Sequence, residues 1–377
     1  MIWHMSKKIC IATSTRADWG ILKPLAAALR DTPGVEVQIL ATNMHLLERY
    51  GHTADEIISD GFEITARVEM PDPEGSALQR ACAMGDCLSG CAREFDRLRP
   101  DAIVILGDRF EMLAVAAAAA VMRIPIVHIA GGETTEGAID NAMRHAISQL
   151  AALHLVSTEP YRQKVVQLGA NPANVINTGS LGVWNMLNQP YMPLDQLAES
   201  VGFDPAKPFA VATFHPATLD NVDAGLRCRE MLAALDQFPD IFVIVTYPNN
   251  DTGSDEIIEA IENWAARNRH RASIVKSLGL KRYLSAIRKA EFVIGNSSSG
   301  IIEVPSVGTP VINIGIRQQG RLHGDAVIDC GDSTAEIASA IRQALSPQFK
   351  AMAKEASNPY FSPDTLGKSV NAILQFI

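Results

Sequence analysis

The chain has 377 residues, of which 47% are hydrophobic and 20% charged, and its formal net charge at pH 7 is -9. This composition is typical of a globular protein, and the length favours two domains because a single core rarely grows so large. The negative charge argues against a nucleic-acid partner, which requires a basic surface, although it permits one anionic ligand in a locally positive cleft.

The N-terminus and the cysteines indicate a cytoplasmic protein. No apolar run long enough for a secretory signal follows the first lysines, and the run Met112–Met122 is too short to span a bilayer, so we expect no membrane partner. Six cysteines in such a chain are expected to be reduced thiols. Cys82, Cys87 and Cys91 lie on one predicted helix without CxxC spacing, which favours helix packing over a metal site.

In the first half of the chain, β-branched runs alternate with helical segments. The runs are continuously apolar, as expected for parallel strands with both faces covered by helices. The predicted strands are Ile9–Thr13, Val35–Ala41, Ala102–Leu106, Pro125–Ile129 and His154–Ser157. The predicted helices lie near Gly20–Arg30, Ala77–Leu98, Glu111–Met122, Ala138–Ala151 and Pro160–Leu168.

The second half repeats this alternation after a predicted linker, Asn185–Lys207, which is rich in Pro, Gln and Asn. Its predicted strands are Phe209–Ala212, Ile241–Thr246, Ser273–Lys276, Phe292–Ile294 and Pro310–Ile314, with a final helix at Pro363–Ile377. The expected domains are 1–184 and 185–362, followed by the helix 363–377. Both are expected to be α/β, Rossmann-like and doubly wound, with a shared cleft at their strand ends as the ligand site.

Charged residues collect after two predicted strands of the first domain. Asp108 follows one strand and Glu133 the next, and Asp140, Arg144 and His145 lie on the helix after them. Ligands bind at such strand ends in open α/β sheets. Singly, Asp108 could cap a helix, and Asp140 and Arg144 could form a surface pair. Together, like charges push their pKa values apart, which supplies an acid and a base at neutral pH.

A turn of small residues, Gly295-Asn-Ser-Ser-Ser-Gly300, follows a strand of the second domain and precedes a helix predicted from near Ile301. Its main-chain N–H groups and hydroxyls can converge on a diphosphate, or the turn can merely cap the helix. Glu303, in the first helical turn, could bind sugar hydroxyls. Arg16 and His215 follow the first strand of each domain; each could bind a phosphate or be structural.

Other nucleotide and catalytic motifs are absent. No GxGxxG follows the first strand, no Walker A run fits a strand-loop-helix context, and neither GxSxG nor HExxH occurs.

The motifs that the chain does contain, the charged residues after the strands and the serine turn, resemble those of the hydrolysing UDP-N-acetylglucosamine 2-epimerase family. The resemblance implies a two-domain fold of the glycosyltransferase-B type with UDP between the domains, no metal or nicotinamide cofactor, and a homodimer or homotetramer. The similar segments, in family order, are Ser14–Asp18, Gly107–Glu111, His128–Glu133, Gly137–His145, Thr178–Gly182 and Gly295–Glu303.

The resemblance also implies site roles. The acid–base candidates are Asp108, Glu133 and Asp140, with Arg144 and His145 supporting. The implied UDP-sugar contacts are Arg16, Asp18, His215, Ser297, Ser298, Ser299, Gly300 and Glu303. The family reaction eliminates UDP and hydrates a glycal, which releases the free 2-epimer. UDP-N-acetylglucosamine would yield N-acetylmannosamine, toward sialic acids. UDP-N,N'-diacetylbacillosamine would yield 2,4-diacetamido-2,4,6-trideoxymannose, toward legionaminic acids.

Three alternatives remain open from the sequence. Non-hydrolysing relatives carry a Glu-Ala-Gly-Leu-Arg run where this chain has Gly-Gly-Glu-Thr-Thr, which favours hydrolysis. Many retaining glycosyltransferases of this fold carry a second Glu eight residues after the first, where Val311 stands here. A nucleotide-sugar-binding regulator would not need three clustered carboxylates.

Overall fold

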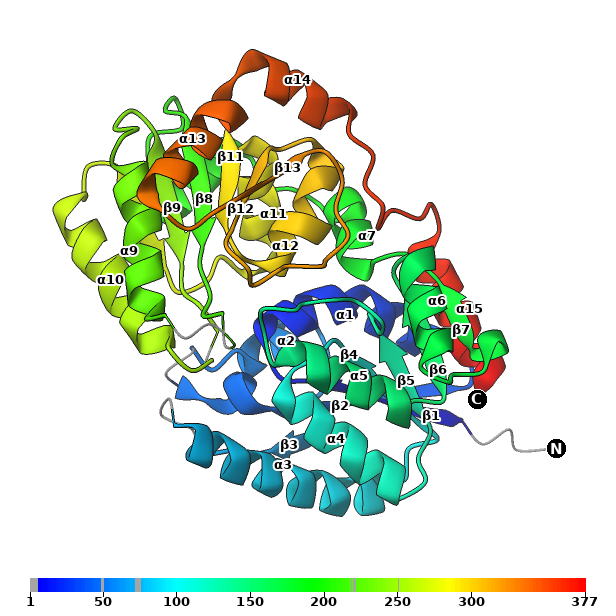
Figure 1. The fold of residues 1–377 in the computed structure, drawn as a ribbon. Coiled ribbons are helices and arrows are strands. Elements are labelled where there is room, and N and C mark those ends of the chain that lie inside the picture. The colour runs from blue at the N-terminus through cyan, green and yellow to red at the C-terminus, as the bar shows by residue number, and fades with distance from the viewer. Residues whose placement is uncertain (1–5, 49–50, 72–75, 218, 220–221, 250) are drawn as a thin grey trace. The chain divides into compact units, whose positions relative to one another are not determined.

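Figure 1 shows the computed structural model, which describes residues 6–48, 51–71, 76–217, 219, 222–249 and 251–377. The first residues of the chain, used above to argue against a signal, lie outside this range. Contacts divide the chain into two compact units: unit 1 comprises Met1–Glu133, Asp140–Trp184 and Tyr360–Ile377, and unit 2 comprises Thr134–Ile139 and Asn185–Pro359. Two segments thus depart from the contiguous ranges expected from the sequence: 134–139 groups with unit 2, and the chain from residue 360 groups with unit 1.

Unit 1 contains a seven-stranded parallel sheet in the order β3-β2-β1-β4-β5-β6-β7. The strands are β1 Lys7–Thr13, β2 Val35–Thr42, β3 Ala66–Val68, β4 Ala102–Leu106, β5 Ile126–Ile129, β6 Leu153–Val156 and β7 Val175–Asn177. The five predicted strands of this half are confirmed. The sequence missed β3 and β7, because three-residue edge strands are too short for a periodic pattern.

Helices cover both faces of this sheet (Figure 1). One buried cluster packs α3, α4 and α5 against it, and the other packs α1, α2 and α15. The helices are α1 Arg16–Arg30, α2 Ala54–Ser59, α3 Ala77–Leu98, α4 Phe110–Val121, α5 Asp140–Leu150, α6 Glu159–Gln167, α7 Leu181–Asn188 and α15 Thr365–Phe376. Short 3-10 turns, η1 Asn43–Leu46 and η3 Pro172–Asn174, complete the unit.

The cysteines of α3 pack in the core as predicted. The Sγ atoms of Cys87 and Cys91 lie 3.9 Å apart, and both residues are fully buried, whereas Cys82 is exposed. All six cysteines of the chain are free thiols. Within the part of the chain that the structure describes, no group of three or more His, Cys, Asp or Glu side chains is placed to hold a metal ion.

Unit 2 contains a six-stranded parallel sheet in the order β10-β9-β8-β11-β12-β13. The strands are β8 Phe209–Thr213, β9 Phe242–Thr246, β10 Ala272–Val275, β11 Phe292–Gly295, β12 Val311–Ile314 and β13 Val327–Cys330. The sequence missed only the edge strand β13. Both sheets are parallel and doubly wound, so the predicted α/β class is confirmed.

Two helix predictions for this half need correction. The predicted linker contains a helix, α8, and the second half of α7, which crosses from unit 1 into unit 2. The helix after the serine turn, α12, begins at Ser298 and not near Ile301. The helices are α8 Leu194–Val201, α9 Ala224–Leu235, α10 Ser254–Arg267, α11 Gly279–Lys289, α12 Ser298–Ile302, α13 Thr334–Leu345 and α14 Pro347–Glu355, with a 3-10 turn η4 Val304–Val307. Over the described ranges, none of the helices has both the length and the apolarity needed to cross a membrane.

Strand order reverses between β1 and β4 in unit 1 and between β8 and β11 in unit 2. The second reversal requires a glycine. Gly295, which ends β11, has φ 136 and pairs with Thr213 of β8. A Cβ atom at Gly295 would lie 1.8 Å from the Thr213 carbonyl oxygen, so no side chain fits without moving the strand.

We predict that Gly295→Ala destabilises unit 2 by about 3 kcal/mol or more, because overpacking adds to an unfavourable positive φ. Urea unfolding of the full chain measures the change. The matched control is Gly85→Ala on the exposed face of α3, where a Cβ meets nothing within 4 Å and alanine favours the helix. An equal loss of stability in both variants would contradict this account.

Three imidazoles are buried in unit 1. Burial is the main cause that lowers the pKa of His45, His128 and His154 to about 4 each. Since these values lie below the ordinary His pKa of 6.5, the unfolded chain binds more protons between the two values. The stability held by the neutral imidazoles is complete above pH 6.5 and is lost as the pH falls toward 4.

His154, on β6, isolates this effect because its buried Nδ1 has no hydrogen-bond partner within the described ranges. When the pH is lowered from 7.5 to 5, the free energy of unfolding should fall in both proteins. We expect the decrease in His154→Leu to be smaller than that in the parent protein by about 2 kcal/mol. Urea unfolding at the two pH values tests this. His270→Ala, which changes an exposed histidine, should keep the parental pH dependence; identical pH dependence in all three proteins would refute the assignment.

Candidate active site

A buried arginine gathers the acidic group of unit 1. Arg144, on the second turn of α5, has a side chain only 3% exposed. Its Nη2 donates to the Asp108 carboxylate, and its Nη1 donates to the Glu133 main-chain oxygen at 2.9 Å. Asp108 follows β4 and Glu133 follows β5, so one guanidinium holds two strand ends. The structure thereby brings together three of the predicted catalytic residues.

The Glu133 carboxylate is also buried, and its Oε1 accepts a hydrogen bond from Ser157 Oγ at 2.8 Å. The backbone before it is strongly curved: Ala130 has φ 62 and Gly132 has φ 79. A Cβ at Gly132 would lie 2.6 Å from the Tyr161 carbonyl oxygen of α6, so the two backbones approach closely there. A strained turn of this kind costs stability and is typical of functional sites.

The other two predicted catalytic residues flank Arg144 on α5. Asp140 is the first residue of the helix and partly exposed, and His145 directly follows Arg144. Burial, with the nearby charges of Lys164 and Arg144, lowers the pKa of His145. Its Nδ1 is buried without a hydrogen-bond partner among the residues described. The imidazole is therefore neutral at pH 7.

His128 has a contact that the sequence did not reveal. Its Nε2 lies 2.8 Å from the Gly107 carbonyl oxygen, and its Nδ1 lies 3.1 Å from Ser148 Oγ. Because a carbonyl oxygen only accepts, Nε2 must donate and Nδ1 accepts from the serine. The Gly107 N–H in turn donates to Ile129 O at 3.0 Å. The residue before Asp108 is therefore clamped to β5 from both sides. The only sign of this contact in the sequence was the position of His128 at the start of the segment His128–Glu133, which contains Gly131 and Gly132.

The end of β1 carries Arg16 and Asp18. Arg16 begins α1, its side chain is 24% exposed, and its Nη1 lies 4.0 Å from Glu56 Oε1. Asp18 Oδ2 accepts from Ser14 Oγ at 2.8 Å and from the Thr15 N–H at 3.1 Å. Burial raises the pKa of Asp18, although the charge of Arg109 opposes this. The Asp18 N–H in turn donates to Thr15 Oγ1 at 3.2 Å, so Thr15 and Asp18 form a helix capping box, a structural role that the sequence analysis did not assign.

In unit 2, Asn296 joins the ends of β8 and β11. Its Nδ2 donates to His215 O at 2.8 Å, and its Oδ1 accepts from the His215 N–H at 2.7 Å. His215 Nδ1 accepts from the Asn249 N–H at 3.2 Å, which leaves Nε2 as the protonated nitrogen of the neutral ring. Sequence reasoning named His215 and missed Asn296, whose amide fixes the backbone of that histidine.

The serine turn follows directly. Ser297 precedes α12, and Ser298, Ser299 and Gly300 form its first turn. Tyr283 OH donates to Ser299 Oγ at 2.7 Å, and Glu303 ends the helix in a buried position. Since α12 has only five residues, its dipole is small, so an anion at this turn would depend mainly on the serine hydroxyls and main-chain N–H groups. The predicted serines directly follow Asn296 at the end of β11.

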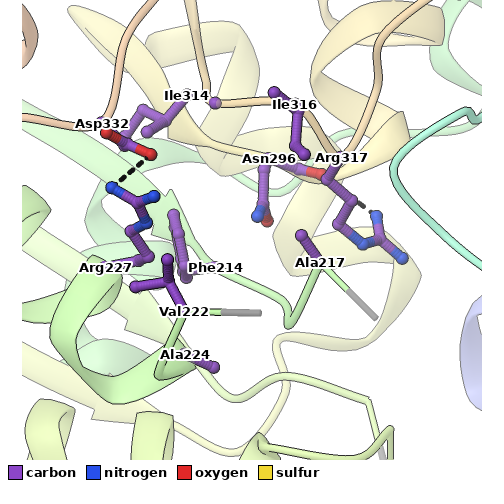
Figure 2. A pocket seen from close by; sticks show the side chains of 11 residues that line it. Phe214, Ala217, Val222, Ala224, Arg227, Asn296, Ile314, Ile316, Arg317 and Asp332 are labelled. Atoms are coloured by element: carbon purple, nitrogen blue, oxygen red, sulfur yellow. Dashed lines mark hydrogen bonds and ion pairs between the residues drawn. The ribbon is translucent and has the colours of Figure 1, made fainter. Parts of the chain in front are cut away.

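A pocket opens beside these strand ends (Figure 2). An ion pair between Arg227 Nη1 and Asp332 Oδ2, 2.5 Å long, closes one side, and Arg317 lies against Asn296 on the other. The pocket is lined by Phe214, Ala217, Val222, Ala224, Arg227, Asn296, Ile314, Gly315, Ile316, Arg317 and Asp332.

Solved structures share this fold. A Staphylococcus aureus MnaA structure with UDP superimposes with a TM-score of 0.81 at 17% identity, covering 98% of this chain and 96% of that one. A Neisseria meningitidis UDP-GlcNAc 2-epimerase bound to UDP-GlcNAc gives a TM-score of 0.79 at 16% identity, covering 98% and 100%. These likenesses confirm the two-domain fold of the glycosyltransferase-B type.

Sequence relatives are closer. A Campylobacter jejuni protein described as a hydrolyzing GDP/UDP-N,N'-diacetylbacillosamine 2-epimerase is 37% identical over 347 residues, which are 92% of this chain and 90% of the relative. The Escherichia coli polysialic acid biosynthesis protein P7 is 37% identical over 372 residues, 98% of this chain and 94% of the relative. The pattern of the UDP-N-acetylglucosamine 2-epimerase family matches residues 27–374. The chain belongs to that family.

Proposed function

We propose that this protein is a hydrolysing UDP-sugar 2-epimerase. It converts UDP-N-acetylglucosamine or UDP-N,N'-diacetylbacillosamine, with water, to UDP and the free 2-epimeric sugar. The observation that carries the proposal is the pairing of Arg144 with Asp108 and with the Glu133 backbone, which places two carboxylates at adjacent strand ends. The names of relatives at 37% and 33% identity, each described as a hydrolyzing 2-epimerase, support the hydrolysing reaction.

The first step needs a base, because the C2 proton is not adjacent to a carbonyl and is weakly acidic. One carboxylate of the set Asp108, Glu133 and Asp140 takes that proton. The C1–O bond breaks as the C1=C2 double bond forms, and its electron pair leaves on the UDP phosphate oxygen. A carboxylate base acting together with stabilised leaving-group charge is the combination this elimination requires.

Donors for the departing diphosphate come from other residues of the proposed site. Arg16 offers a planar guanidinium, and the Ser297–Ser299 hydroxyls and N–H groups offer neutral donors. His215, protonated at Nε2, supplies one more N–H, and Glu303 accepts from sugar hydroxyls. Asp18 supports Arg16 through the helix cap.

The second step is the addition of water to the glycal. Water adds to C1 and a proton is delivered to C2 from the opposite face, which releases the inverted free sugar. The same acidic cluster serves this step in different protonation states, with Arg144 and His145 supporting. No metal or nicotinamide enters either step.

Several finer properties belong to the same proposal. The name of the Escherichia coli relative supports a role in the synthesis of sialic acids, and a role toward legionaminic acids stays a prediction from the family resemblance. A cytoplasmic location fits six cysteines that all remain free thiols. Assembly as a homodimer or homotetramer stays a prediction from the family resemblance, and size-exclusion chromatography with light scattering would measure it.

The reaction is tested by incubating the pure protein with each UDP-sugar in deuterated water and following the products by NMR. Free 2-epimer with deuterium at C2 is the expected result. Epimerised sugar still attached to UDP would indicate the non-hydrolysing reaction, and transfer only to an added acceptor would indicate a glycosyltransferase. No turnover with either UDP-sugar would contradict the proposal.

The carboxylates give a sharper prediction. Asp108→Asn, Glu133→Gln and Asp140→Asn should each slow turnover at least about a hundredfold, the usual scale for a lost acid or base, while UDP still binds. Steady-state kinetics and calorimetric UDP titration measure the two properties. Glu199→Gln, on an exposed position of α8, serves as the neutral control. Parental rates in all three site variants would refute the assignment.

A further inference from the structure

The chain between the two carboxylates Glu133 and Asp140 belongs to unit 2, although both carboxylates belong to unit 1. We call this segment, Thr134–Ile139, the strap. Thr135, Gly137 and Ala138 are buried within it. The strap thus lies in the first half of the sequence but packs with residues more than 170 positions later in the chain. Its two ends are bonded directly to Glu133 and Asp140, two of the proposed acid–base residues.

The strap is held by the loop Ile316–Arg321, which we call the holding loop. The Glu136 N–H donates to Gln319 O at 3.1 Å. Arg321, only 6% exposed, donates from Nη2 to Thr135 Oγ1 at 2.8 Å and from Nε to Thr134 O at 3.3 Å. A buried guanidinium is unfavourable unless its hydrogen bonds are made, so this geometry ties the strap firmly to the loop.

Close packing adds to these hydrogen bonds. A Cβ at Gly137 would lie 2.4 Å from Ile316 O, and a Cβ at Gly320 would lie 2.7 Å from Thr134 Cγ2. Gly320 also has φ 79. The Gly137 contact is with main-chain atoms and requires glycine, and the positive φ of Gly320 favours glycine there.

The holding loop continues to the serine turn. Arg317 Nη1 and Gln318 Nε2 donate to Asn296 O at 3.1 and 2.9 Å, and Arg317 Nε donates to Pro216 O at 3.2 Å. Asn296 immediately precedes Ser297, and Pro216 immediately follows His215. A chain of hydrogen bonds thus runs from the proposed UDP contacts through the holding loop to the strap.

We propose that Arg321 is a positioning residue. It holds the strap so that UDP bound at the serine turn orders the segment between Glu133 and Asp140, and thereby places both carboxylates for the elimination step. Arg321 acts through the strap and touches no reacting atom. The expected effect of Arg321 on turnover rests on the proposed function. The expected effect of bound UDP on the strap does not depend on which reaction the protein catalyses.

The coupling is tested by hydrogen–deuterium exchange of the full chain with and without saturating UDP. UDP should slow exchange in the peptide containing 134–139 at least threefold in the parental protein, and Arg321→Met should lose that protection. Arg342→Met, which removes an exposed arginine of α13, is the matched control and should keep it. Unchanged strap exchange on addition of UDP to the parental protein would overturn the inference.

The kinetic consequence is tested with the same variants. Arg321→Met should lower kcat at least tenfold while KM changes less than threefold, because the strap places catalytic groups and does not itself hold the nucleotide. Arg321→Lys keeps the charge without the guanidinium fork and should restore only part of kcat, which also guards against a misfolded methionine variant. Gly137→Ala should reproduce the kcat loss, with Gly85→Ala as its control.

A parental kcat in both Arg321 variants would overturn the positioning role. If the parental protein released no free 2-epimer, the proposed function would fail, and the exchange measurement alone would then decide whether Arg321 couples the strap to UDP.

Discussion

The buried guanidinium of Arg144 constrains the whole acidic site of unit 1. Removing a guanidinium from water is unfavourable unless its hydrogen bonds are replaced, and here the replacements are the Asp108 carboxylate and the Glu133 carbonyl. These partners follow different strands, so the register of β4 against β5 and the rotation of α5 must agree. Loss of either partner would leave a buried charge incompletely paired. Arg144 thus holds the Asp108 side chain and the Glu133 backbone, while Ser157 orients the Glu133 carboxylate.

Neutral groups complete this arrangement. Burial keeps His128 uncharged, so it can clamp the Gly107 carbonyl without adding a buried cation. Ser157 donates to Glu133 in the same way, as a neutral hydroxyl. The Glu133 carboxylate is therefore oriented by a donor that does not cancel its charge, whereas Asp108 is ion-paired with Arg144. A carboxylate without a cationic partner is the stronger base of the two, which suits a group that must take a proton from a sugar.

Unit 2 is organised around Asn296. Its side chain bonds to the His215 backbone, and its carbonyl accepts from both Arg317 and Gln318. Gly295, directly before it, allows β11 to run against the β8 backbone. One short stretch therefore joins the serine turn, the histidine and the holding loop. Through that loop, the strap lies in the same hydrogen-bonded framework as the proposed diphosphate contacts.

Much of the fold followed from local patterns in the sequence. Continuous apolar runs identified ten parallel strands because both of their faces are buried, and α3 was predicted with its observed bounds, Ala77–Leu98, where Ser76 caps a long amphipathic segment. Polar residues directly after those runs indicated the site, since parallel strands end at a common edge. The edge strands β3 and β7 were missed because three residues are too few for a pattern, and β13 was missed because the exposed Asp329 interrupts its apolar run.

The remaining features depend on contacts between residues far apart in the chain. The sequence by itself determined the α/β class, the strand-end carboxylates and the family, because these depend on local residue patterns and their order. Only the tertiary structure decided that Arg144 pairs with Asp108, 36 residues away, that Asn296 fixes His215, 81 residues away, and that the strap belongs to unit 2. Side-chain direction and long-range packing select these partners, and neither is encoded in a local pattern.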